Sequence, residues 1–131
     1  MPSRLEPQSW EVEGYPYLVA GDGSTIPTGT DGAFYVREAR TIRWWELAGP
    51  SDQTGSISLS LRAATYGTYP AVSEILAPHI AGGVKNSSRE APTLGNVSVP
   101  IPGDTWVEVV VVSSSGFTKW VALTLGLENH P

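Results

Sequence analysis

Hydrophobic residues alternate with polar or small residues over several short stretches of the chain, and this two-residue period is typical of a β-strand with one buried face. The clearest stretch is Ser56–Ala63, where serine and arginine alternate with aliphatic residues. Its inward positions are expected to be Ile57, Leu59, Leu61 and Ala63. Further strands are predicted at Tyr15–Ala20, Gly32–Glu38, Arg40–Ala48 and Val97–Ile101. Pro16 favours an edge position for the first of them, because proline cannot donate to a strand ladder.

The last long segment, Asp104–Leu127, predicts a hairpin of two long antiparallel strands near the middle of a sheet. Its first arm holds an unbroken valine run, Val109–Val112, and β-branched residues fit a pleated surface. In its second arm, from Trp120 onward, Val121, Leu123, Leu125 and Leu127 alternate strictly with other residues. Between the arms, Ser113–Gly116 supplies a polar turn with one glycine.

The stretch between Thr65 and Pro92 is the least regular part of the sequence. Tyr66–Pro70 reads as a turn, and Ala71–Ala77 predicts one or two helical turns before Pro78. A connection of this length in a small domain is either functional or lies across one end of a sandwich.

These elements predict an all-β fold: an antiparallel β-sandwich, jelly-roll-like, of about seven to eight strands. We expect one domain over residues 15–131, preceded by a short extended N-terminal arm over residues 1–14. At 131 residues the chain can bury a core without metal or crosslinks, and it contains no cysteine. The 14 glycines and 11 prolines fit the many turns that short strands need.

The charge of the chain argues against nucleic acid as a partner. The formal net charge is −5, whereas binding to phosphate backbones requires clustered lysine and arginine. Arg37, Arg40 and Arg43 fall in one short stretch, which we interpret as a solvated sheet edge. No apolar run approaches the ~20 residues that span a bilayer, and the N-terminus lacks the apolar core of a signal peptide, so we expect no membrane insertion and synthesis in a cytoplasm.

No arrangement of reactive residues points to catalysis. His79 and His130 have no further metal ligands nearby in the sequence, and no serine elbow or phosphate-binding glycine loop is present. Glycoside hydrolysis needs two carboxylates placed across a cleft. The candidates that lie on predicted strands are Glu46 and Glu108. We interpret both as solvated, and we expect no enzyme activity, no catalytic residue, no cofactor and no metal.

Surface contacts are the remaining way for such a protein to act. Tyr66 and Tyr69, in the irregular segment, are the candidate exposed aromatic contacts, since outward tyrosine and tryptophan are common in carbohydrate-binding and protein–protein surfaces. Trp10 is a large apolar group in an acidic arm; it either folds back on the domain or docks on a neighbouring subunit. Arg37 and Arg43 are the other candidate assembly contacts.

Several short motifs, taken in order, resemble a β-sandwich domain of tailed-bacteriophage tail-fibre and minor tail proteins. They run from Ile26–Gly29 through Thr41–Ala48, Ser51–Ile57, Tyr69–Pro70 and Pro102–Asp104 to the closing strand Thr118–Leu125. The resemblance spans about Tyr15 to Leu127. It implies a virion component, often at the distal end of the tail, with no cofactor and no catalytic residues.

The sequence therefore predicts a bacteriophage virion structural protein, a small minor tail or tail-fibre-type subunit made in the host bacterial cytoplasm. We expect other virion proteins as partners, a homo-oligomer with a trimer favoured, and contact with a host-surface glycan or protein. A capsid decoration protein is the alternative within this class. A free carbohydrate-binding module is the alternative from another class.

Overall fold

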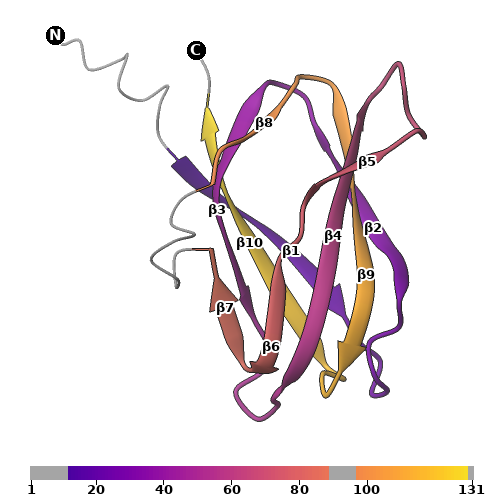
Figure 1. Cartoon of the computed structure of the whole chain (residues 1–131), viewed down its shortest axis with the longest axis vertical. Coiled ribbons are helices and arrows are strands. Elements are labelled where there is room, and N and C mark those ends of the chain that lie inside the picture. The colour runs from indigo at the N-terminus through magenta and orange to yellow at the C-terminus, as the bar shows by residue number, and fades with distance from the viewer. Residues whose placement is uncertain (1–11, 89–96, 130–131) are drawn as a thin grey trace, which may run out of the picture.

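The computed structural model describes residues 12–88 and 97–129, and every regular element in these ranges is a β-strand (Figure 1). Ten strands form two antiparallel five-stranded sheets that face each other. Sheet A contains β1 (Val12–Ala20), β10 (Trp120–Asn129), β3 (Arg40–Ala48), β7 (Lys85–Ser87) and β8 (Val99–Ile101). Sheet B contains β2 (Gly29–Val36), β9 (Thr105–Ser115), β4 (Gly55–Thr65), β5 (Ser73–Leu76) and β6 (His79–Gly83). The predicted all-β antiparallel sandwich is confirmed.

The strand pairing is nested, which gives the sandwich its jelly-roll topology. The first strand pairs with the last, β2 pairs with β9, β3 pairs with β8, and β4 pairs with β5. The chain is thus one long antiparallel ribbon that has been rolled up, and the β10–β3 and β9–β4 pairs close the roll. Successive strands at each end of the chain therefore alternate between the two sheets.

The predicted hairpin over Asp104–Leu127 is wrong in one respect. Both arms are long central strands, but β9 lies in sheet B and β10 lies in sheet A, so they do not pair with each other. The connection between them is an arch that crosses from one sheet to the other. Phe117 in this arch has no exposed surface, and it closes the end of the core between the two sheets.

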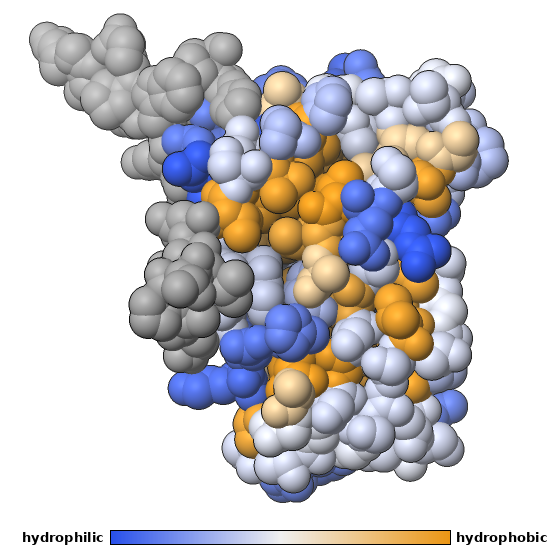
Figure 2. All heavy atoms as spheres, in the orientation of Figure 1, coloured by the Kyte–Doolittle hydropathy of each residue, from blue (hydrophilic) through white to orange (hydrophobic). Residues whose placement is uncertain are grey.

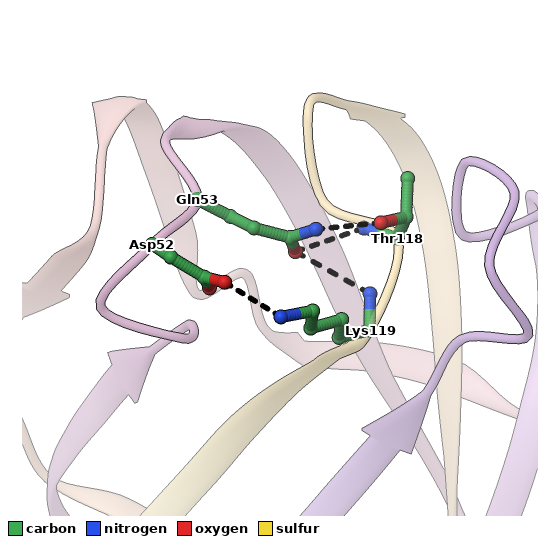
Figure 3. Close-up of polar contacts among 4 residues, drawn as sticks. All are labelled: Asp52, Gln53, Thr118 and Lys119. Carbon is green, nitrogen blue, oxygen red and sulfur yellow. Dashed lines mark hydrogen bonds and ion pairs between the residues drawn. The ribbon is translucent and has the colours of Figure 1, made fainter.

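The arch is held by the two loops on either side of it. In the β1–β2 loop, the N–H groups of Gly21 and Ile26 donate to the carbonyls of Lys119 and Phe117, at 2.7 and 3.0 Å. On the other side, the side-chain amide of Gln53 in the β3–β4 loop both donates a hydrogen bond to Thr118 and accepts one from it, as Figure 3 shows. An ion pair between Asp52 and Lys119, 2.6 Å long, lies further out in solvent. One end of the sandwich is therefore organised around this crossing.

The core lies between the sheets and is made of the inward positions of the four longest inner strands. Val107, Val109 and Val111 of β9 face Val121, Leu123 and Leu125 of β10, and all six are almost completely buried. In β4, Ile57, Leu59 and Leu61 are buried as predicted, whereas Ala63 is half-buried and Ser60, which was expected to face outward, is completely buried.

A bulge at Arg43 explains why β3 carries apolar residues on both of its faces. Ile42 pairs with Leu127 and Trp44 with Gly126, so Arg43 is the extra residue on the β3 side. Ile42 and Trp45 both point into the core in consequence, while the indole of Trp44 lies on the outer face, directly over Gly126. Any Cβ at Gly126 would collide with that ring, so glycine is required there.

The predicted helical turns over Ala71–Ala77 are also wrong. This segment forms β5, which extends sheet B by pairing Leu76 with Leu61 and Glu74 with Arg62. Ile75 and Leu76 pack against the core from this position. Tertiary pairing with a long, regular neighbour strand outweighs local helix preference here.

Candidate functional site

The outer face of sheet B carries a group of aromatic side chains that we call the aromatic patch: Tyr35, Tyr66, Tyr69 and Trp106. Strand pairing sets Tyr35 of β2 directly beside Trp106 of β9, with ring centroids 4.9 Å apart. The loop between β4 and β5 brings Tyr69 against the other side of Trp106, at 6.2 Å. Tyr66, from the same loop, is the most exposed of the four. Three segments far apart in the sequence thus meet in one row of rings.

Two carboxylates are fixed beside the rings by tyrosine hydroxyls. The hydroxyl of Tyr35 donates to Asp104 at 2.7 Å, and that of Tyr69 donates to Glu108 at 2.7 Å. Each hydrogen bond is the main reason that the pKa of its tyrosine lies above the usual value, with burial adding to it. Both phenols therefore stay protonated and keep donating to these carboxylates in neutral solution.

Asp104 joins the parts of the patch through its backbone as well. Its carbonyl accepts from the N–H of Tyr66 at 2.8 Å, and its own N–H donates to the carbonyl of Arg37 at 3.0 Å. It adopts a left-handed conformation, with φ of 55°, which aspartate tolerates better than most residues. Asp104 thereby ties the β4–β5 loop to the end of β2.

The two tyrosines chosen from the sequence, Tyr66 and Tyr69, are exposed and lie in this patch. Sequence reasoning missed their neighbours Tyr35, Trp106 and Asp104. The available signal was the alternation within β9, where Trp106 and Glu108 occupy positions opposite in phase to the core valines. Glu46, the other carboxylate considered for hydrolysis, lies on sheet A rather than beside Glu108 on sheet B.

The outer face of sheet A has a different character, and we call it the flat face: Pro16, Leu18, Ala48, Trp120, Ala122 and Thr124. Cross-strand pairing aligns Leu18, Ala122 and Ala48 in one row. Leu18 is 58% exposed and Trp120 is 37% exposed, and they are diagonal neighbours on adjacent strands. A shallow hollow of about 240 Å³ includes Ala48, Ala122 and Thr124 of this face and is flanked by Glu46 and Lys85.

The edge of this face is β1, whose second side is not paired with any strand of the described residues. Pro16 lies in the middle of it, as the sequence predicted for an edge strand. Its missing N–H interrupts the row of donors that a further strand would need. The flat face is therefore better suited to packing through side chains than to strand addition.

The two candidate assembly residues that the structure describes, Arg37 and Arg43, lie in different places. Arg37 is exposed in the loop after β2, whereas Arg43 is the bulged residue in the interior of sheet A, so they do not share one sheet edge. Arg43 already interacts within the chain, at 3.3 Å from Ser98 and 3.8 Å from Glu128. Trp10 and most of the arm lie outside the described residues, and residues 12–14 of the arm belong to β1. Their assembly roles stay predictions.

Two hollows open at the margins of the sandwich. One, of about 340 Å³, lies near the start of β1 and is bordered by Glu13, Tyr15, Arg37 and Arg40. The other, of about 210 Å³, opens between the sheets where β8 approaches β5, with Ala63, Ile75 and Ile101 in its walls. Figure 2 shows hydrophobic residues at the surface on the side of the molecule that carries β5 and β8.

Neither margin holds an arrangement of groups suited to a metal. No cluster of three or more histidine, aspartate or glutamate residues with metal-binding geometry occurs in residues 12–88 and 97–129. His79 instead lies beside the ring of Trp45, with centroids 5.9 Å apart. No helix long and apolar enough to cross a membrane occurs in the described part of the chain.

Comparison with known proteins adds little beyond the fold. No protein-family model and no curated protein matches the chain. A chain in the structure of infectious bursal disease virus, Gx strain, is weakly similar, with a TM-score of 0.37 and 13% sequence identity. The match covers 92% of this chain and 32% of that one. The β-sandwich implied by the resemblance to phage tail proteins is present, whereas membership of that family stays a prediction.

Proposed function

We propose that the chain is a structural protein of a bacteriophage particle, a small minor tail or tail-fibre-type subunit that acts by packing against other virion proteins. The observation that carries this proposal is the flat face of sheet A, where Leu18 and Trp120 are exposed side by side next to the unpaired edge of β1. Large apolar side chains that are exposed together on one face are typical of protein–protein contacts.

The architecture supports the same class of function. Jelly rolls recur in viral capsid proteins and in lectins, although a fold by itself does not determine function. The rolled topology pairs the first strand with the last over nine positions, so both ends of the described chain are held in one rigid sheet. Such a body suits a component that is placed in many copies and must keep its shape. The motif order that resembles tail-fibre domains supports the tail over the capsid.

Incorporation into particles tests the proposal. A phage lacking the gene is complemented with wild type, Leu18→Asp, Trp120→Asp or Val112→Asp, and the copies per purified particle are measured by quantitative mass spectrometry. Val112 is the matched control, because it is 52% exposed but lies on sheet B. We expect the number of copies per particle to fall at least tenfold for the two sheet A variants, since the loss of a central contact costs about 2 kcal/mol or more of binding free energy. Val112→Asp should be incorporated normally.

Absence of the wild-type protein from particles, or equal incorporation of all variants, would contradict the proposal. Immunogold labelling of the same particles separates the two locations within it. Label on the tail supports the tail subunit, whereas label over the head would identify a capsid decoration protein instead. Circular dichroism of each purified variant checks that the sandwich is intact.

A further inference from the structure

We infer that the aromatic patch on sheet B is a binding site for an uncharged carbohydrate chain, a property that goes beyond assembly and does not depend on it. The rings of Tyr35, Trp106 and Tyr69 form a continuous row across β2, β9 and the β4–β5 loop. Neighbouring ring centroids along the row are 4.9 and 6.2 Å apart, so the row offers stacking area for more than one sugar ring. Apolar sugar faces stack on such rings, while their hydroxyl groups need polar partners around the rim.

The rim supplies those partners in fixed positions. A carboxylate can accept about four hydrogen bonds, and the hydroxyls of Tyr35 and Tyr69 each occupy one such position, on Asp104 and Glu108. The remaining positions can accept from sugar hydroxyls without any side chain having to move. Because the tyrosines hold the carboxylates in place, little conformational freedom is lost on binding.

The charges around the patch favour an uncharged ligand over an anionic one. Arg37 lies near Tyr35, and Arg62 lies between its cross-strand neighbours Glu108 and Glu74, so carboxylates outnumber the arginines around the patch. A hydroxyl group can donate to the carboxylates and accept from the arginines, so a neutral glycan uses both kinds of group. A phosphate or sulfate placed on the rings would face two carboxylates fixed on them.

The patch is a surface row rather than a deep cleft, so each copy should bind weakly. Display in several copies compensates for this, because linked sites gain about 10²–10⁴ in overall avidity. The assay must therefore present the full chain multivalently.

The test is a glycan array carrying neutral and anionic oligosaccharides, probed with biotinylated full chain assembled on streptavidin. Four proteins are compared: wild type, Tyr66→Ala, Tyr69→Ala and Trp120→Ala. Trp120 is the matched control, since it is as exposed as Tyr69, at 37%, but lies on the opposite sheet. Tyr66 is 72% exposed, so its replacement does not disturb packing.

We expect the wild type to bind neutral glycans, Tyr66→Ala and Tyr69→Ala to lose at least tenfold in signal, and Trp120→Ala to bind as the wild type does. No signal from the wild type, binding to anionic glycans alone, or equal binding by all four proteins would overturn the inference. Failure to bind any glycan together with specific capture of a protein through Tyr66 would also overturn it. None of these outcomes bears on incorporation into particles, which depends on the other sheet.

Discussion

The side-chain amide of Gln53 forms hydrogen bonds with Thr118 in both directions across the end of the sandwich. Its Nε2 donates to the hydroxyl of Thr118 at 2.6 Å, and its Oε1 accepts from the backbone N–H of Thr118 at 3.1 Å. The same oxygen accepts from the N–H of Lys119 at 3.3 Å. One residue thus satisfies two backbone donors in the arch that carries the chain from sheet B to sheet A (Figure 3).

Replacing Gln53 by alanine should therefore lower the free energy of unfolding by about 1–2 kcal/mol, because the partly buried N–H of Thr118 and the exposed N–H of Lys119 both lose their acceptor. Gln53→Glu should cost less, since a carboxylate still accepts from both N–H groups. The control is Lys119→Met, which removes only the exposed ion pair with Asp52 and should change stability little. Urea unfolding measures all three. A larger loss from Lys119→Met than from Gln53→Ala would contradict this role of the amide.

A side chain at Gly116 should destabilise the protein, whereas a side chain at Gly67 should be tolerated. Gly116 has φ of +86° and its Cβ would strike the carbonyl of Thr54, so Gly116→Ala should lose more than about 1 kcal/mol. No atom lies within 4 Å of a Cβ at Gly67, and Gly67→Ala should be neutral or slightly stabilising. Thermal unfolding of the two variants makes the comparison. Equal effects would mean that Gly116 does not hold this left-handed conformation against the carbonyl of Thr54.

Trp44 and Gly126 should behave as a coupled pair. Gly126→Ala pushes the indole of Trp44 off the outer face of sheet A and should destabilise the protein by about 1–3 kcal/mol. In a Trp44→Ala background the same change should cost clearly less, because the ring it displaces is gone. A double-mutant cycle by chemical denaturation measures the coupling. Strict additivity would show that Trp44 does not lie over Gly126.

Three tyrosines that donate to carboxylates should make the protein sensitive to alkali. Burial and a hydrogen bond to Asp31 raise the pKa of Tyr17 well above its ordinary value of 10.0, and hydrogen bonds to Asp104 and Glu108 raise those of Tyr35 and Tyr69. A raised folded-state pKa contributes stability that is complete below the unfolded pKa and is lost as pH rises through the folded one. Thermal stability should therefore fall above about pH 10.

Tyr17→Phe should weaken this alkaline loss, because the variant has no phenol at this half-buried position that could ionise on unfolding. Melting curves from about pH 8 to about pH 12 compare the variant with the wild type, with tyrosinate absorbance followed in parallel. The account is wrong on this point if Tyr17→Phe leaves the slope of stability against pH unchanged.

The sequence predicted the strands better than it predicted their partners. Alternation is a local property, so it located Arg40–Ala48 to the residue and identified Ile57, Leu59 and Leu61 as core positions of β4, but it missed the burial of Ser60 and Ala64. Partner choice depends on where the chain turns, and β9 and β10 have the same pattern whether they pair in a hairpin or cross between sheets. Phe117 is in phase with the buried residues of β10, so its apolar side chain does not distinguish the two arrangements either.

The aromatic patch was half visible in the sequence for a similar reason. Tyr66 and Tyr69 are close to each other along the chain and lie in an irregular segment, where exposure could be expected. Tyr35 and Trp106 are 71 positions apart, and only the register of β2 against β9 brings them together. A single sequence does not contain that register, because each strand alone fixes only which of its faces is buried.

The most direct test of the account is side-chain accessibility in the free protein and in purified particles. Oxidative labelling followed by mass spectrometry reports Trp120 on the flat face and Tyr66 on the aromatic patch in one experiment. We predict that labelling of Trp120 falls several-fold in the particle while that of Tyr66 is unchanged, because the flat face is covered and the patch stays open to solvent. Trp120 labelled equally in both states, or no copy of the chain in the particle, would contradict the account.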